Sequence, residues 1–370
     1  MKVAYLLGSL NRGGTETLLL DVCRHLKNQE IEALGVYRKK GILESDFLQS
    51  GIPFEYLPVG KNIFSYLFRL RKMLLSNNIS VVHAQQPLDA LLARLATLFS
   101  SVAVVLTLHG FDFSPEKRKR VWLKLILRST HANVYVSKYQ RDYYVDRYKL
   151  QPGRQWVVYN GIDASKIDVP DGKPFLRSEL KAEPDTLLLG MVGNFNEVRD
   201  QFTVCRFLHL LNREGVDFRF VFAGKRIDSM SERYDRCVEY CKQNGLSDKV
   251  TFSGVRNDVP KLLHELDAFI YSTEHDTFGI AVAEAMMAGI PVFVNDWEVM
   301  REITDNGNLA VLYKTGEEND LLAKFLLYLQ DKQNFRAKAE ETAVAMKKRY
   351  SVRQHIDGLL VVYKKIKNGN

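Results

Sequence analysis

The sequence predicts an α/β protein made of two doubly wound parallel sheets in tandem. Short apolar, β-rich runs alternate with amphipathic helical stretches along almost all of the 370 residues, which is the rhythm of strands and crossover helices. That rhythm stops once, at residues 163–186, where Pro, Asp, Lys and Gly are dense and no long apolar run occurs. Each such sheet opens a crevice at the carboxyl ends of its strands, so two facing sheets would form one central cleft.

The first half of the chain carries the strands of the first sheet. Amphipathic segments at residues 15–29 and 87–100 are typical of helices that cover such a sheet. Strands are expected at residues 2–10, 32–38, 54–59, 80–85, 103–110, 132–137 and 155–161.

The second half resumes the same alternation after the predicted linker. The prediction is an N-terminal domain of residues 1–165, a C-terminal domain of residues 166–350, and a last helix at about 351–370 that packs back on the N-terminal domain. Strands are expected at residues 187–195, 218–225, 250–255, 268–273, 290–296 and 308–313, and helices at 318–331 and 355–368.

The composition is that of a soluble globular protein. Charged residues make up 26% of the chain, and no apolar run reaches about 18 residues, so no transmembrane helix is expected. The polar start of the chain is typical of a first strand and lacks a signal-peptide cleavage site. The four cysteines are expected to be small buried hydrophobes in a reducing compartment, which favours a cytoplasmic protein.

The net charge of +8 is unevenly distributed. Residues 1–170 hold 24 Lys and Arg against 14 Asp and Glu, whereas the rest of the chain holds 28 against 30, so the first half is expected to face something anionic. Residues 65–78 and 114–130 mix cations with Leu, Phe and Trp, a combination that suits an anionic membrane surface. A core-packed helix with a solvated basic face would have the same composition. No recognised nucleic-acid-binding module occurs, so nucleic acid is not an expected partner.

Glycine-rich or polar turns follow several predicted strands, where a parallel sheet offers its ligand crevice. Gly13 and Gly14 precede a helix start and would let a phosphate approach the backbone, although a tight turn needs the same glycines. His109 could form a hydrogen bond with a sugar hydroxyl, or it could have only a structural role. Arg199 and Lys225 follow two later strands, where a cation suits a diphosphate; a solvated surface cation is the alternative.

One helix start carries two carboxylates, Asp276 and Glu284, in an otherwise small and apolar segment. Phe278 and Gly279 begin the predicted helix, so its first backbone amides would point into the crevice. Glu284 falls among alanines that allow close packing, where an unpartnered charge is costly. A carboxylate there can accept two hydrogen bonds from the vicinal hydroxyls of a ribose. The alternative is a helix with one solvent-facing glutamate.

Taken together, these segments resemble the nucleotide-sugar-dependent retaining glycosyltransferases of family 4 (glycosyl transferases group 1), which have the GT-B fold of two Rossmann-like domains. The family signature is a glutamate, seven residues and a second glutamate, in a context like E-G-F-G-x-x-x-x-E-A-M-A-x-G. This chain matches it at Phe278, Gly279, Glu284, Ala285, Met286 and Gly289. The resemblance extends to Gly13, Gly14 and Glu16, to His109 and Gly110, and to residues 136–144, 158–163 and 250–273.

The resemblance implies a set of site residues. The catalytic group would be Asp276, Glu284, Arg199 and His109, with Glu284 on the ribose hydroxyls, Arg199 on the leaving diphosphate and His109 on the donor sugar. Donor-binding groups would be Gly13, Gly14, Lys225, Val255, Arg256, Phe278 and Gly279, with Val255 and Arg256 near the base.

This chain departs from the family pattern at two positions. Asp276 replaces the first glutamate of the signature and is one methylene shorter. Asn194 occupies a position where the family often has a second cation, so Arg199 would act with help from Lys225 or Arg226.

The resemblance implies a retaining hexosyl or N-acetylhexosaminyl transferase that uses a nucleotide sugar, with UDP favoured over GDP. Its acceptor would be a saccharide or lipid-linked saccharide of bacterial surface polysaccharide synthesis, reached at the inner face of the membrane. No D-x-D motif occurs, so neither a metal nor another cofactor is expected. A non-catalytic sugar-nucleotide-binding subunit and a GT-B-like sugar-nucleotide epimerase are the alternatives.

Overall fold

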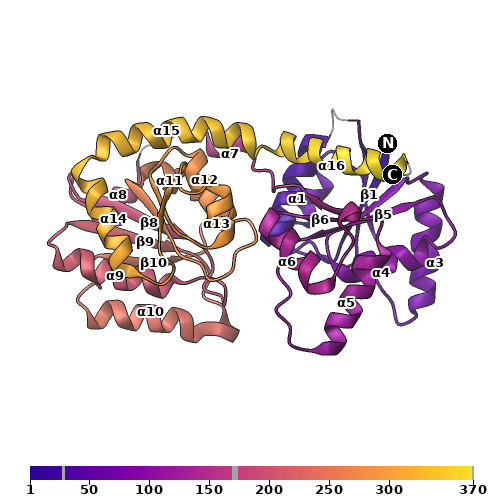
Figure 1. Ribbon diagram of the computed structural model, residues 1–370, viewed down its shortest axis with the longest axis horizontal. Coiled ribbons are helices and arrows are strands. Elements are labelled where there is room, and N and C mark those ends of the chain that lie inside the picture. Colours follow the sequence, from indigo (N-terminus) through magenta and orange to yellow (C-terminus); the bar gives the residue numbers. More distant parts are fainter. Residues whose placement is uncertain (27–29, 169–173, 369–370) are drawn as a thin grey trace. The chain divides into compact units, whose positions relative to one another are not determined.

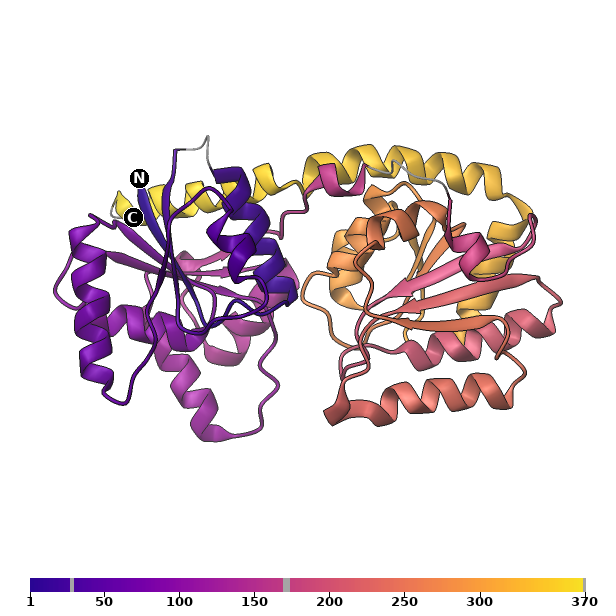
Figure 2. The same cartoon turned by 180° about the vertical axis from the view of Figure 1, so that it is seen from behind.

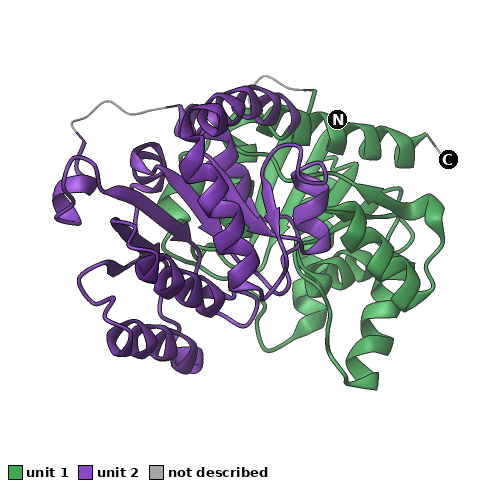
Figure 3. Ribbon diagram, turned by 60° about the vertical axis from the view of Figure 1, so that its left-hand side comes forward, with its two compact units in different colours: residues 1–162, 350–370 green, residues 163–349 purple. Residues whose placement is uncertain are grey.

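The computed structural model describes all residues except 27–29, 169–173 and 369–370. The chain forms two compact units, each with its own sheet (Figures 1–3). Unit 1 consists of residues 1–162 and 350–370, and unit 2 consists of residues 163–349. The final helix, α16 (Val352–Lys367), therefore belongs to the same unit as the first strand.

The sheet of unit 1 has seven parallel strands in the order β3-β2-β1-β4-β5-β6-β7. Each lies within one of the seven predicted segments, which confirms these strands. They are β1 (Lys2–Leu7), β2 (Glu32–Tyr37), β3 (Phe54–Tyr56), β4 (Val81–Ala84), β5 (Ala103–Leu108), β6 (Ala132–Tyr135) and β7 (Gln155–Val157).

Helices cover the described part of this sheet on both faces. They are α1 (Gly14–His25), α2 (Glu44–Leu48), α3 (Ile63–Ser76), α4 (Pro87–Ala96), α5 (Lys117–Ser129), α6 (Lys138–Tyr148) and α16. The prediction of a helix at residues 15–29 is confirmed as far as His25, and residues 27–29 lie outside the described residues.

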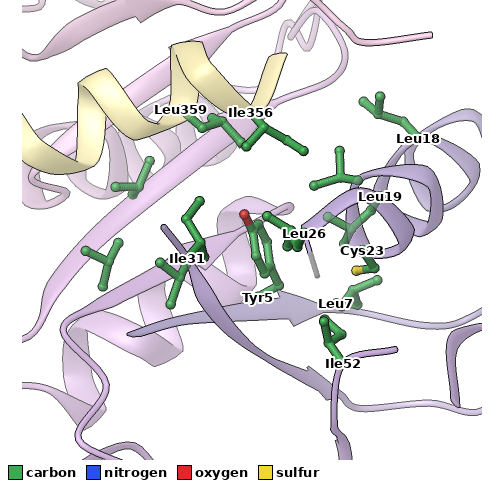
Figure 4. Packing of buried hydrophobic residues seen from close by; sticks show 14 of the residues in the cluster. Tyr5, Leu7, Leu18, Leu19, Cys23, Leu26, Ile31, Ile52, Ile356 and Leu359 are labelled. Atoms are coloured by element: carbon green, nitrogen blue, oxygen red, sulfur yellow. The ribbon is translucent and has the colours of Figure 1, made fainter. Parts of the chain in front are cut away.

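The alternation of side chains along β1 separates the two cores of unit 1. Val3, Tyr5 and Leu7 face a cluster that includes residues of α1 and α16, and Figure 4 shows Ile356 of α16 in that cluster with Tyr5. Ala4 and Leu6 point the other way, into a cluster formed with α3, α4 and α5. Because both faces are buried, the strands appear in the sequence as almost continuous apolar runs.

The sheet of unit 2 has six parallel strands in the order β10-β9-β8-β11-β12-β13. All six lie in predicted segments: β8 (Leu187–Val192), β9 (Phe218–Ala223), β10 (Val250–Gly254), β11 (Ala268–Tyr271), β12 (Val292–Asn295) and β13 (Val311–Tyr313). The helices are α7 (Ala164–Ile167), α8 (Leu176–Glu179), α9 (Gln201–Arg213), α10 (Ser231–Gln243), α11 (Val259–Glu265), α12 (Ile280–Met287), α13 (Glu298–Ile303), α14 (Glu318–Gln330) and α15 (Lys332–Arg349).

The predicted linker at residues 163–186 is not open chain where the structure describes it. It contains α7 and α8, and both pack on α11 within unit 2. The Glu265 carboxylate accepts hydrogen bonds from the backbone N–H groups of Phe175 and Leu176, which fixes the start of α8. Residues 169–173 of this segment lie outside the described residues.

Two expectations from composition can be compared with the structure. All four cysteines are buried and free, as predicted. Across the described residues, no helix combines the length and apolar character needed to span a bilayer.

Candidate functional site

The switch point of the second sheet lies between β8 and β11, the two neighbouring strands from which the chain winds in opposite directions. The loops that follow these strands are joined to each other. Arg199 and Thr273 form an antiparallel bridge, the N–H of Glu274 donates to the carbonyl of Val198 (3.0 Å), and the Thr273 hydroxyl donates to the same carbonyl (2.6 Å). The sequence therefore places Arg199 at the position where open α/β sheets bind ligands.

Arg199 is largely buried within unit 2. Its Nη1 lies 3.0 Å from Oδ2 of Asp276, and its guanidinium carbon lies 5.3 Å from the ring centre of Tyr271. Burial alone would lower the pKa of Arg199, but the Asp276 carboxylate raises it above the ordinary value. Arg199 is therefore a fixed cation at every physiological pH.

The start of α12 depends on Gly279, which has φ +80° and precedes the first helical residue. A Cβ at this position would approach the terminal methyl group of Met300 to 2.7 Å, so that side chain would have to shift, while the positive φ itself favours glycine. The N–H groups of Phe278 and Gly279 donate to Oδ1 of Asp276, and the indole of Trp297 donates to the Asp276 carbonyl (3.1 Å). The loop before α12 is thus organised around Asp276.

Glu284 is half-buried, on the helix that starts at this loop. Its neighbours Ala283 and Ala285 are fully buried, and α12 packs against α15 and β12. Gly289, with φ +74°, follows α12 and donates its N–H to Met286, as predicted for the end of this helix. The ribose role of Glu284 stays a prediction.

Arg226, predicted to help Arg199, and Arg256, predicted near the base, are paired with carboxylates of their own surroundings. Arg226 binds Asp235 through two nitrogens (2.9 and 3.0 Å). Arg256 binds Glu179 and Asp258 (2.6 and 2.8 Å), and these partners raise its pKa. Both side chains therefore hold loops of unit 2 together.

Lys225 and Val255 have open surroundings. Lys225 is exposed, and no acidic side chain in the described parts of the chain pairs with it. Val255 is 60% exposed just beyond β10. These two positions stay candidates for contact with a nucleotide.

Asn194 has a structural function that the sequence did not indicate. Its side-chain oxygen accepts a hydrogen bond from the backbone N–H of Lys225 (2.9 Å). The N–H of Phe195 donates to the carbonyl of the same lysine (3.0 Å), so the loops after β8 and β9 are fastened together. A lysine or arginine at 194 would have no oxygen for this bond.

In unit 1, the predicted residues follow β1 and β5. Gly13 caps α1 with an extended backbone, and Gly14 is the first residue of that helix. His109 Nε2 lies 2.8 Å from the side-chain oxygen of Gln85, which follows β4. Burial lowers the pKa of His109 to about 3, so its imidazole is neutral at pH 7. Gln85 was not among the predicted residues, although it also follows a buried strand.

The class of protein follows from this architecture. Two Rossmann-like units with a cation and a helix start at the switch point of the second sheet constitute the GT-B arrangement of glycosyltransferases. The chain belongs to the glycosyl transferases group 1, whose family model matches residues 172–367, and the model of glycosyltransferase family 4 matches residues 12–166. The protein is therefore a glycosyltransferase, as the signature predicted.

Individual relatives support the same conclusion. An Escherichia coli UDP-Gal:α-D-GlcNAc-diphosphoundecaprenol α-1,3-galactosyltransferase is 23% identical over 299 residues, which cover 76% of each chain. A crystal structure of a glycosyltransferase from Rickettsia africae ESF-5 superposes with a TM-score of 0.88 at 17% identity, covering 100% of this chain and 99% of the other. Anabaena HepE, crystallised with UDP and glucose, gives 0.86 at 18% identity, covering 99% and 100%. These two structures show the shared fold.

Proposed function

We propose that the protein is a retaining, metal-independent transferase that moves a hexose or N-acetylhexosamine from a UDP-sugar to a saccharide or lipid-linked saccharide. The acceptor would belong to bacterial surface polysaccharide synthesis. Support comes from relatives that include the diphosphoundecaprenol galactosyltransferase and a Staphylococcus aureus capsular polysaccharide glycosyltransferase. The observation that carries the proposal is the buried Arg199 beside the start of α12 at the switch point of unit 2.

In this proposal, unit 2 binds the donor. Glu284 accepts hydrogen bonds from the ribose hydroxyls, and Val255 lies against the base. Cleavage of the sugar–phosphate bond leaves negative charge on the diphosphate, and Arg199 and the first amides of α12 stabilise that charge without reorganising. Since these groups supply the positive charge, a divalent metal is not required, and transfer should persist in EDTA.

The acceptor is assigned to unit 1. Gly13, Gly14 and His109, which follow β1 and β5 of this unit, keep the donor roles that the resemblance implies. A neutral His109 donates or accepts a hydrogen bond and adds no charge to the site. The acceptor hydroxyl would attack on the face that the diphosphate leaves, and a phosphate oxygen would take its proton. No side chain is then needed as a nucleophile.

Thermal shift is the direct test of donor binding, because a ligand of the native state raises Tm. We expect UDP and at least one UDP-sugar to raise Tm, and Arg199→Ala to abolish the shift. Arg353→Ala, an exposed arginine of α16, is the matched control and should keep it. Absence of a shift with UDP and GDP sugars alike would contradict the proposal. Transfer to lipid-linked saccharides, with the anomeric configuration of the product read by NMR, tests the remaining steps.

We also propose that unit 1, to which the acceptor is assigned, binds the inner face of an anionic membrane. Adjacent helices α3, α4 and α5 cover one face of the sheet, and their outer surfaces expose large apolar side chains. Phe64 of α3 is 77% exposed and Leu125 of α5 is 64% exposed. Helix α5 has no acidic residue, and its cations are Lys117, Arg118, Lys119, Arg120, Lys124 and Arg128.

Sedimentation with vesicles tests this surface. We expect the wild type to bind phosphatidylglycerol vesicles at physiological salt and to leave phosphatidylcholine vesicles unbound. A Trp122→Ser, Leu125→Ser double variant should lose most of this binding, because it removes apolar side chains from the outer surface of α5. Val361→Ser on α16 removes an equally exposed apolar residue elsewhere and should bind as the wild type does. Failure of the wild type to sediment would rule out the membrane part of the proposal.

A further inference from the structure

The carboxylate of Asp276 is buried, and both of its oxygens are used by neighbouring groups of unit 2. Oδ1 accepts hydrogen bonds from the backbone N–H groups of Phe278 (3.3 Å) and Gly279 (3.1 Å). Oδ2 accepts from the Tyr271 hydroxyl (2.8 Å) and lies 3.0 Å from Nη1 of Arg199. An ionised carboxylate has about four acceptor positions, so these four donors fill it.

The length of the side chain accounts for this inward orientation. An aspartate can accept hydrogen bonds from the N–H groups two and three residues farther along, which closes a local turn. Asp276 makes both of these bonds, and they keep its carboxylate next to its own backbone. A glutamate would carry the charge one methylene farther out.

Arg199 has one further hydrogen-bond donor, its Nε–H. Its Nε–H is buried and has no hydrogen-bond partner in the part of the chain that the structure describes. This nitrogen faces Gly193, where a Cβ would lie 3.3 Å away. The nitrogen nearest to Asp276 is Nη1, which also donates to the Thr273 hydroxyl. The guanidinium is therefore fixed by Asp276 at Nη1, while Nε has no acceptor among the described residues.

We propose that Asp276 is a positioning residue, the internal counterion of Arg199, and that it does not contact the donor sugar. In the empty protein its charge balances a buried guanidinium that would otherwise be costly. A bound diphosphate must share Arg199 with Asp276, so Asp276 weakens the grip on the diphosphate and favours its release as product. This inference rests on the proposed function, because it takes a nucleoside diphosphate as the ligand.

Calorimetric titration of the full chain with UMP, UDP and UDP-glucose tests the inference. Asp276→Asn keeps an oxygen for the two backbone N–H groups and removes the charge. We expect this variant to bind UDP and UDP-glucose at least threefold more tightly, by the same factor for both. UMP has no β-phosphate, and its affinity should change less than twofold. Asp185→Asn, an exposed residue just before β8, is the matched control and should leave all three affinities unchanged.

A second arm repeats the titrations in an Arg199→Gln background. If Asp276 acts through Arg199, Asp276→Asn will no longer change the affinity for UDP there. A full-sized effect in that background would overturn the inference. So would weaker binding of UDP-glucose with unchanged UDP, because that pattern indicates direct contact with the sugar, and so would no change for any ligand.

A milder variant keeps the test valid if Asp276→Asn does not fold. Tyr271→Phe retains the ring and removes one donor to the carboxylate, so Asp276 competes more strongly for Arg199. UDP and UDP-glucose should then bind more weakly by equal factors, and unequal factors would contradict the inference. If the wild type binds neither UDP nor GDP nor their sugars, the proposed function fails, which is a different outcome from equal binding by wild type and variants.

Discussion

Gly193 lies directly against Arg199: a Cβ on this glycine would be 3.3 Å from Nε and 3.5 Å from Cδ of the arginine. The contact with Nε would be tighter than most Cβ contacts in proteins, so a side chain at 193 would require the Arg199 side chain to move by a few tenths of an ångström. The end of β8 therefore contributes to the candidate site through the space it leaves beside a charged group.

Gly193→Ala should weaken UDP binding roughly tenfold, which is about 1.4 kcal/mol. The added methyl group would displace the Arg199 side chain, to which the proposed function assigns the diphosphate. Calorimetric titration with UDP measures the effect. Gly153→Ala is the control, because a Cβ there has no neighbour within 4 Å; it should bind UDP like the wild type. Wild-type affinity in Gly193→Ala would show that Nε plays no part in binding.

Asn194→Asp should weaken UDP binding severalfold while leaving Tm nearly unchanged. The aspartate keeps an oxygen for the N–H of Lys225 but adds a negative charge to the loop after β8. Asn194→Ala is the complementary variant: it removes the hydrogen bond, with a cost of about 1 kcal/mol in the free energy of unfolding, and adds no charge. Equal UDP affinity for the aspartate variant and the wild type would place residue 194 away from the ligand.

Gly279→Ala should lower the free energy of unfolding by about 1–3 kcal/mol and reduce nucleotide binding. The residue has φ +80°, and the new methyl group would meet Met300. Gly215→Ala separates the effect of the positive φ from the effect of the contact with Met300, because Gly215 has φ +76° but no neighbour within 4 Å of an added Cβ. In Gly215→Ala the free energy of unfolding should fall by only about 1 kcal/mol, and UDP should bind as it does to the wild type. Urea unfolding and UDP titration of both variants provide the comparison.

Acid should destabilise unit 1 through its buried histidines. His83 contacts the hydroxyls of Tyr363 (2.5 Å) and Thr107 (2.6 Å), and burial lowers its pKa to about 3. The unfolded chain takes up a proton near pH 6.5 and the folded one does not, so stability falls as the pH drops from about 6.5 towards 3. The loss is about 1.4 kcal/mol per pH unit for each such histidine.

Urea unfolding between pH 6.5 and pH 5 measures this slope, above the range where carboxylates dominate. His83→Gln should have a shallower slope, because glutamine does not titrate. Leu359→Ala is a destabilised control: it leaves a cavity in the core cluster that contains Tyr363, the partner of His83, and should keep the wild-type slope. Identical slopes for wild type and His83→Gln would show that His83 does not cause the loss of stability in acid.

The sequence predicted the strands well because both sheets are buried on both faces. Such strands are short apolar runs, and turns between them carry glycine or polar residues. The positions of Arg199 and His109 followed from the same logic, since His109 comes directly after β5 and Arg199 lies in the loop between β8 and α9. The order of the strands required the structure.

The sequence could not show where charged side chains point. Arg256 is held by Glu179, which lies 77 positions earlier in the chain, and no local pattern announces that pair. Asp276 turns towards the N–H groups of Phe278 and Gly279, and its sequence neighbours alone do not predict this orientation. Hydrogen-bond networks that join distant loops are thus the part of the site that sequence patterns leave open.

The return of α16 to unit 1 has a consequence for biosynthesis. Residues 163–349 are contiguous, so unit 2 can complete its core while later residues are still inside the ribosome. Unit 1 includes β1 and α16, and Tyr5 is covered by Ile356 and Leu359 only once α16 has left the ribosome. Until α16 emerges, one apolar face of the first half stays uncovered, so a chain truncated before α16 should be prone to aggregation.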